Sequence, residues 1–264
     1  MSNEDVDADP AGRCVIGVVG ASGGLGATTL CAALAMRTAM ARGRSLLIDA
    51  HPRGGGIDIH LGLDTEVGLR WPDLVSVRGA VETAEVVAGL PSVEGCTVLS
   101  WDRRPGFALG ADGVHLTRAL TATSGICVID LPGPEADQHE RWWQLCDQVV
   151  MLCGGRVHQV AAAAVVAECL LAAVERDDHG GHRSQAEVTE ASVCGVLREQ
   201  QRGAADRDLV STVLGLPFVG VMRPDATVGS ALTRGEPVGV RSGPVASLAD
   251  AILAETLPSA RGAA

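Results

Sequence analysis

A short apolar run that ends in a glycine-rich turn constrains this chain more than any other stretch. The segment from Cys14 to Leu30 is CVIGVVGASGGLGATTL, in which four glycines fall between Gly20 and Gly26 and an Ala- and Leu-rich segment follows. This order predicts a strand, a glycine loop and a helix. Glycines suit a loop whose backbone N–H groups turn inward around phosphate oxygens, and the N-terminus of the next helix adds partial positive charge. The stretch therefore predicts a phosphate-binding loop.

The loop differs from the usual P-loop at the position that carries charge. The common pattern G-x-x-x-x-G-K-[ST] does not fit, because Gly20 to Gly26 holds one position too many and Ala27 stands where the lysine belongs. The deviant pattern K-G-G-x-G-K-[ST]-T of the MinD/ParA class fits better. We align this pattern with Ser22-Gly23-Gly24-Leu25-Gly26-Ala27-Thr28-Thr29. The chain then has the glycines and both threonines of the pattern but lacks both lysines. All 21 basic residues are arginine, so no lysine elsewhere in the chain can replace them.

The missing lysine affects binding and catalysis unequally. A charge-assisted hydrogen bond to phosphate contributes roughly 1.5–3 kcal/mol, so its loss weakens binding on the order of 10- to 100-fold while the backbone loop and Mg²⁺ remain. Removal of a donor aimed at transition-state charge typically costs about 10²–10³ in rate. We therefore expect nucleotide binding to survive where fast hydrolysis does not.

Two later apolar runs each end in an aspartate. The first is SLLID, ending at Asp49, and the second is ICVID, ending at Asp130 before Leu-Pro-Gly. A carboxylate at the carboxyl end of a strand beside a phosphate loop holds Mg²⁺ through water or orients the attacking water. Asp130 stands at the Walker B position, where it would hold the Mg²⁺ water shell opposite Thr28.

Three other features have two interpretations each. His51 follows Asp49 by two positions and is either a proton acceptor or, the interpretation we favour, a non-catalytic loop residue. Trp71 is expected to pack in the interior rather than to dock a partner. Arg103 and Arg104 are expected to be a solvated charge run rather than phosphate ligands.

The rest of the chain alternates strands with helices. Such alternation predicts an α/β fold with a doubly wound, mainly parallel sheet and helices on both faces, whose ligands bind at the strand carboxyl ends. We expect an acidic, disordered leader over 1–13, a single domain over 14–258 and a flexible tail over 259–264. The further predicted strands are 96–100, 148–153, 191–197 and 218–222, and the predicted helices are 28–41, 111–122, 157–174, 204–213, a helix ending at 233, and 245–256.

Composition limits the classes of partner. A net charge of −11 argues against a broad electrostatic footprint on nucleic acid or on an anionic membrane. The longest apolar stretch, Val160 to Val174, contains Glu168 and is too short to span a membrane, so membrane association is expected to be peripheral at most. The eight cysteines lack C-x-x-C spacing, which predicts buried thiols and a reducing cytoplasm.

Taken together, these motifs resemble the MinD/ParA (SIMIBI) P-loop ATPases over about residues 14–255. The residues that carry the resemblance are Ser22 to Thr29, Leu47 to Asp49, Val128 to Pro132, and the tail motifs LPFVGV (216–221) and GEPV (235–238). Within that group, the Gly-Ala-Thr-Thr ending of the loop and the segment 54–74 resemble the CpaE/TadZ branch. More narrowly, they resemble its septum-site-determining (Ssd), secretion-neighbourhood CpaE-like members.

The resemblance implies a cytoplasmic homodimer that binds ATP or ADP with Mg²⁺. Such a protein localises Tad pilus or secretion machinery, or influences septum placement, at a polar, septal or membrane position set by its partners. Carried onto this chain, the loop residues from Ser22 to Thr29 would contact phosphate or Mg²⁺, and Asp49 and Asp130 would act around the metal. Arg223-Pro224-Asp225 would lie near the adenine.

Three functional hypotheses remain open at this point. The leading one is a nucleotide-dependent positioning protein with little or no ATPase activity. The second is a working MinD/ParA-type ATPase in which an arginine replaces the lysine, and the third is a nucleotide-free pseudo-ATPase adaptor. A chromosome-partitioning role is the weakest, because it needs a cationic surface.

Overall fold

The computed structural model describes residues 13–51, 55–74, 82–104, 109–175, 192–199 and 205–257. The predicted leader and tail therefore lie outside the described residues, apart from Arg13. The described chain forms one eight-stranded sheet in the order β3-β4-β2-β5-β1-β6-β7-β8, and every neighbouring pair is parallel except β3 with β4. The strands are β1 Cys14–Gly20, β2 Ser45–Asp49, β3 Ser92–Val93, β4 Cys96–Leu99, β5 Ile126–Asp130, β6 Gln148–Gly154, β7 Ser192–Arg198 and β8 Phe218–Met222.

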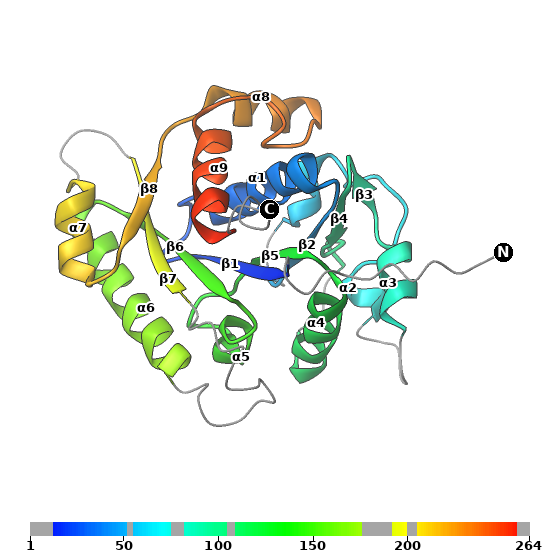
Figure 1. Cartoon of the computed structure of the whole chain (residues 1–264), viewed down its shortest axis with the longest axis horizontal. Coiled ribbons are helices and arrows are strands. Elements are labelled where there is room, and N and C mark those ends of the chain that lie inside the picture. Colours follow the sequence, from blue (N-terminus) through cyan, green and yellow to red (C-terminus); the bar gives the residue numbers. More distant parts are fainter. Residues whose placement is uncertain are drawn as a thin grey trace, which may run out of the picture.

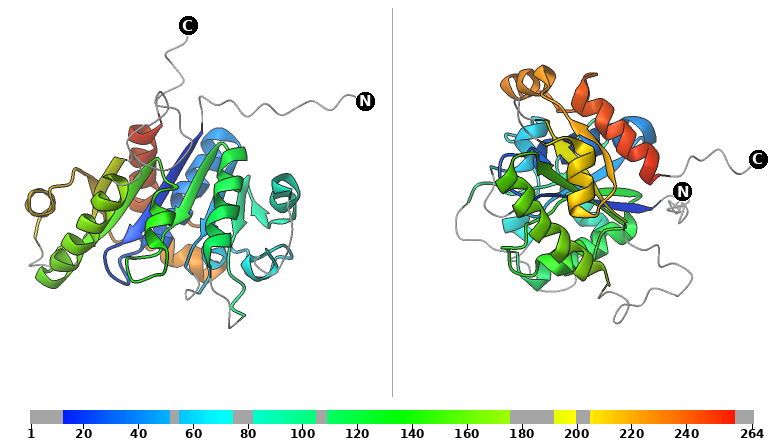
Figure 2. Two further views of the ribbon diagram at one scale, coloured as in Figure 1. Left: turned by 90° about the horizontal axis from the view of Figure 1, so that it is seen from below. Right: turned by 90° about the vertical axis from the view of Figure 1, so that its left-hand side faces the viewer.

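Helices cover both faces of this sheet (Figures 1 and 2). One apolar core joins the sheet to α1, η2, α8 and α9, and a second joins the opposite face to α2 to α7. The predicted doubly wound architecture is confirmed. The helices are α1 Ala27–Arg42, the 3-10 helix η2 Ile57–Leu61, α2 Trp71–Leu74, α3 Thr83–Gly89, α4 Ala111–Thr123, α5 His139–Trp143, α6 Val157–Glu175, α7 Arg207–Leu214, α8 Ala226–Arg234 and α9 Pro244–Thr256.

The central strands are apolar along their whole length because both of their faces are covered. Strands β2, β5 and β6 are buried at every position, which explains why their sequences lack the alternation of a half-exposed strand. The cysteines are free thiols, and all are buried except the half-buried Cys169, as predicted. Trp71 is fully buried and its indole N–H donates to the carbonyl oxygen of Asp49 at 2.6 Å, so the packing interpretation is confirmed.

Arg103 and Arg104 are both exposed, as the interpretation of a solvated charge run predicts, but both also form ion pairs that were not predicted. Arg103 forms a two-pronged ion pair with Asp58, at 2.7 Å and 3.2 Å, and the Asp58 side chain is fully buried. Arg104, although half exposed, pairs with Asp73 at 2.7 Å and with Asp102. These arginines tie the segment after β4 to η2 and α2, because a buried carboxylate is stable only when paired. The phosphate alternative for these two residues has no support in this arrangement.

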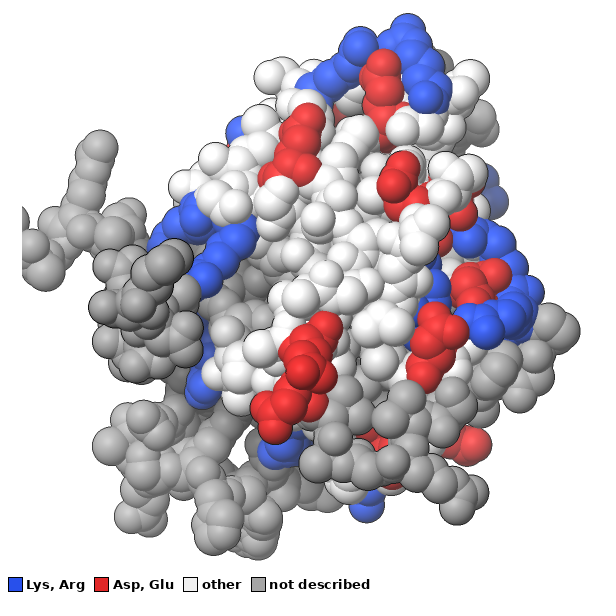
Figure 3. Space-filling model, turned by 90° about the vertical axis from the view of Figure 1, so that its right-hand side faces the viewer, with Lys and Arg blue, Asp and Glu red and all other residues white. Residues whose placement is uncertain are grey.

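The side of the molecule that carries the β3 edge has no broad basic patch among its described residues (Figure 3). Acidic and basic side chains are interspersed there around an uncharged centre. In the part of the chain that the structure describes, none of the helices combines the length and apolarity needed to cross a membrane.

Candidate functional site

The glycine loop between β1 and α1 forms an open cradle of backbone amides. Gly24 and Gly26 have φ angles of +76° and +97°, in the left-handed region that other residues rarely adopt. Gly26 is also the N-cap of α1, and a Cβ at this position would lie 3.1 Å from Cε of Met222. Among the described residues, no partner accepts a hydrogen bond from the backbone N–H groups of 22–29. These free donors, at a helix N-terminus, are suited to phosphate oxygens.

Two carboxylates lie side by side beneath the loop. Asp49 and Asp130 are paired across β2 and β5, and their exposed fractions are 2% and 1%. The Thr28 hydroxyl donates to Oδ2 of Asp130 at 2.7 Å. Asp49 accepts hydrogen bonds from the backbone N–H groups of His51 and Ile57, at 2.9 Å and 3.0 Å. The fold thus brings together Thr28, Asp49 and Asp130, the three side chains predicted to surround a metal. Thr28 and Asp130 are about a hundred positions apart in the sequence.

The electrostatics of this pair favour a divalent cation. Burial, followed by repulsion from Asp130, raises the pKa of Asp49 to about 7. Burial also raises the pKa of Asp130, although the Thr28 hydroxyl opposes that shift. Oδ1 of Asp130 is buried and has no hydrogen-bond partner among the described residues. Mg²⁺ is commonly bound by one or two carboxylates together with substrate phosphates, so the donors present here fit that ion.

We expect the metal-free protein to lose stability as the pH rises from about 4 to about 7. The raised pKa of Asp49 means that the folded state keeps until about pH 7 a proton which the unfolded state releases near pH 4, so the stabilisation is lost progressively over that range. Burial lowers the pKa of His60, so this residue makes the stability rise with pH, but only at pH values below its ordinary pKa. Urea unfolding in the presence of EDTA measures the free energy of unfolding at each pH. We expect Asp49→Asn to make this free energy depend less on pH. An unchanged pH dependence in that variant would contradict the assignment of the effect to Asp49.

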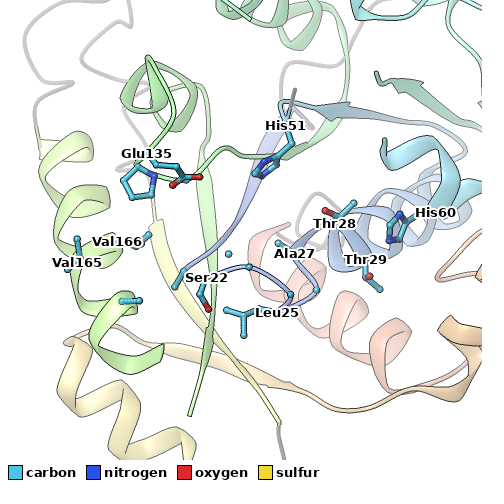
Figure 4. A pocket seen from close by; sticks show the side chains of 18 residues that line it. Ser22, Leu25, Ala27, Thr28, Thr29, His51, His60, Glu135, Val165 and Val166 are labelled. Carbon is cyan, nitrogen blue, oxygen red and sulfur yellow. The ribbon is translucent and has the colours of Figure 1, made fainter. Parts of the chain in front are cut away.

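The glycine loop borders a cavity of about 770 Å³, whose lining includes Thr28 but neither Asp49 nor Asp130. Figure 4 shows His51 and Glu135 on the side opposite Ser22 and Leu25, and His60 beside Thr29. Ala162, Val165 and Val166 of α6 form an apolar wall. The only ionisable side chains among the described lining residues are His51, His60 and Glu135, so this lining holds no arginine. A cavity of this size accommodates a nucleotide.

The other predicted site residues have clear positions but untested roles. Nε2 of His51 lies 3.9 Å from Oδ1 of Asp130, and its side chain is 39% exposed. Arg223 follows β8, whose Met222 approaches Gly26, but none of Arg223, Pro224 and Asp225 lines the cavity. The Asp225 carboxylate caps α8 through Thr227 N at 2.8 Å and accepts from Val245 N of α9 at 2.9 Å. Its observed function is capping, and contact of this segment with an adenine stays a prediction.

Sequence reasoning missed Glu135, His60 and the apolar wall of α6. Their side chains reach the cavity from three different segments, so no local motif contains them. Glu135 could have been predicted from its position in the loop that follows the Walker B aspartate, because such a loop lies at the nucleotide edge of the sheet. The wall residues had none, since an Ala- and Val-rich helix resembles any buried helix.

Comparison with known sequences finds two relatives of this chain. No protein-family model matches the chain. Two proteins of Mycobacterium tuberculosis, the uncharacterized proteins Rv3660c (strain ATCC 25618 / H37Rv) and MT3760 (strain CDC 1551 / Oshkosh), are each 32% identical over 222 residues. The match covers 84% of this chain and 57% of each relative, so the chain spans little more than half the length of these curated relatives.

Three solved structures have the same fold at low sequence identity. The ParA family ATPase of Chlorobium tepidum TLS has a TM-score of 0.72 at 13% identity, covering 92% of this chain and 98% of that one. The septum site-determining protein MinD of Pyrococcus horikoshii OT3, complexed with Mg-ADP, scores 0.68 at 14%, with coverages of 90% and 94%. The MinC:MinD cell division complex of Aquifex aeolicus scores 0.67 at 17%, with coverages of 93% and 98%. The chain has the fold of the MinD/ParA P-loop ATPases.

Proposed function

We propose that this protein is a nucleotide-binding positioning protein that binds ATP or ADP with Mg²⁺ and hydrolyses ATP slowly or not at all. The observation that carries the proposal is the open amide cradle of 22–29 beside the hydrogen-bonded pair of Thr28 and Asp130, with alanine at position 27. The cradle and the Thr28–Asp130 pair support binding of phosphate and metal, whereas alanine at position 27 lacks the charge that a lysine would supply during phosphate transfer. The solved neighbour that contains Mg-ADP supports the choice of ligand.

Each residue has a defined role in this proposal. The backbone N–H groups from Ser22 to Thr29 hold the phosphates, and Thr28 and Asp130 hold Mg²⁺ with its water. Bound Mg²⁺ would neutralise part of the phosphate charge. Asp49, fixed by two backbone donors, orients water near the metal. His51 lies close enough to the free oxygen of Asp130 to share that water, which gives it a positioning role.

The proposed biological role is spatial organisation through a nucleotide-dependent homodimer. The MinD and ParA neighbours support a positioning role at the level of fold, and the MinC:MinD complex is an example of such a fold with a protein partner. The resemblance of segment 54–74 to the CpaE/TadZ branch supports the narrower proposal that the protein localises Tad pilus or secretion machinery, or influences septum placement. Both narrower roles rest on sequence resemblance.

The charges at the cavity favour a second candidate function. The described lining residues include Glu135 and no arginine, and the buried carboxylate of Asp130 accepts a hydrogen bond from Thr28 of the lining, so this arrangement opposes an anionic ligand unless a cation accompanies it. A nucleotide-free adaptor would retain the fold for docking alone. Absence of nucleotide binding at any Mg²⁺ concentration would favour this adaptor.

Phosphate release and mass in solution test the proposed function together. We expect the mass to double with Mg-ATP and phosphate release to remain about 10²–10³-fold slower than in an Ala27→Lys variant, because that donor acts on transition-state charge. Asp49→Ala is the control for genuine turnover, since activity that survives this change comes from a contaminant. A mass that does not depend on nucleotide would contradict the positioning mechanism, and fast turnover abolished by Asp49→Ala would show a working ATPase.

A further inference from the structure

Glu135 brings a negative charge into the phosphate side of the cavity. It lies on the loop after β5 and faces the glycine loop across the cavity (Figure 4). Its carboxylate lies over Gly133, in space that a Cβ at position 133 would occupy. Among the described residues, no arginine forms an ion pair with Glu135.

The position of Glu135 relative to the metal residues shows which phosphate it would meet. Mg²⁺ bridges the last two phosphates of a bound nucleoside triphosphate. Thr28, which donates to Asp130, and Glu135, which follows Asp130 by five residues, both line the cavity, and Glu135 lies across it from Ser22 and Leu25 of the glycine loop (Figure 4). The terminal phosphate of a triphosphate, held by the glycine loop, would extend into the space between that loop and the loop 133–135. A diphosphate has no group at that place.

We infer that Glu135 is a specificity-determining residue that makes the site favour nucleoside diphosphates over triphosphates. This inference rests on the proposed function. Like charges at close range repel, and the lysine that would offset this repulsion is absent from position 27. Glu135 is exposed, so water screens its charge and the expected discrimination is moderate. We expect a factor of about 5, which corresponds to roughly 1 kcal/mol.

The test is the ratio of Mg-ADP to Mg-ATP affinity, measured by calorimetry for the wild type and two variants. Glu135→Gln keeps the shape of the side chain, removes its charge and is expected to raise the affinity for Mg-ATP relative to Mg-ADP about fivefold. Asp137→Asn removes one charge from the same loop at an exposed position outside the cavity lining, and is expected to leave the ratio unchanged. High salt is expected to reduce the preference of the wild type for the diphosphate, because screening weakens the repulsion.

The outcomes separate this inference from the proposed function. If the wild type binds both nucleotides and Glu135→Gln leaves the ratio unchanged, the inference is overturned while the proposed function stands. If Asp137→Asn changes the ratio as much as Glu135→Gln does, the effect is one of net charge and the assignment to Glu135 is wrong. If the wild type binds neither nucleotide, both fall. Thermal unfolding of each variant shows that a changed ratio does not come from a damaged fold.

Discussion

Replacement of Asp58 by asparagine is expected to lower the free energy of unfolding by about 3–5 kcal/mol, the usual effect of removing one partner of a buried ion pair. Asp58 is fully buried between two arginines: Arg103 at 2.7 Å, and Arg70, whose Nε lies 3.6 Å away and whose side chain is 6% exposed. Without the carboxylate, the Arg70 charge stays in the interior, where its hydrogen-bond acceptors among the described residues are backbone carbonyls. Urea unfolding at neutral pH measures the change.

Asp250→Asn provides the matched control. Asp250 also forms a two-pronged pair, with Arg37 at 2.7 Å and 2.8 Å, but its side chain is 48% exposed. An exposed pair of this kind contributes about 0–1 kcal/mol, so the same substitution should have little effect there. Equal losses in the two variants would contradict the view that burial makes the Asp58 pair important. The comparison isolates burial, because both sites lose an Asp–Arg pair.

Introduction of lysine at position 27 is expected to strengthen Mg-ATP binding about 10- to 100-fold, since a charge-assisted hydrogen bond to phosphate contributes roughly 1.5–3 kcal/mol. Ala27 begins α1 and lines the cavity, so a longer side chain there can extend along the phosphates. Calorimetric titration of the variant measures the gain. Ala27→Gln, which is long but neutral, is the control and should gain much less. Equal affinity of wild type and Ala27→Lys would mean that the loop does not hold phosphate as proposed.

Local patterns were sufficient to predict the part of the site built on strand ends. Apolar runs that end in Gly20, Asp49 and Asp130 fix three strands, and a parallel sheet places their carboxyl ends at one edge. The hydrogen bond between Thr28 and Asp130 follows from that topology, although the two residues are remote in sequence. Fold prediction succeeded for the same reason, because strands buried on both faces differ clearly in sequence from the helices between them.

Pairings between side chains from separate segments were not predictable in this way. The ion pair between the exposed Arg103 and Asp58 was not predicted, because the two residues are 45 positions apart. The hydrogen bonds by which the Asp225 carboxylate caps α8 and joins it to the start of α9, twenty positions on, were not predicted either. The short elements η2, β3 and α5 were missed because a few residues do not establish a helical or alternating period. In each case tertiary contacts, not local sequence, determine the outcome.

Calorimetric titration of the wild-type protein with Mg-ATP and Mg-ADP tests the central claim most directly. The account predicts micromolar binding that weakens at least tenfold in EDTA, because Thr28 and Asp130 act through the metal and the amide cradle alone remains without it. Binding that needs Mg²⁺ would establish a working nucleotide site without lysine. Absence of binding at millimolar nucleotide, with Mg²⁺ in excess, would contradict it and leave the fold as a docking surface.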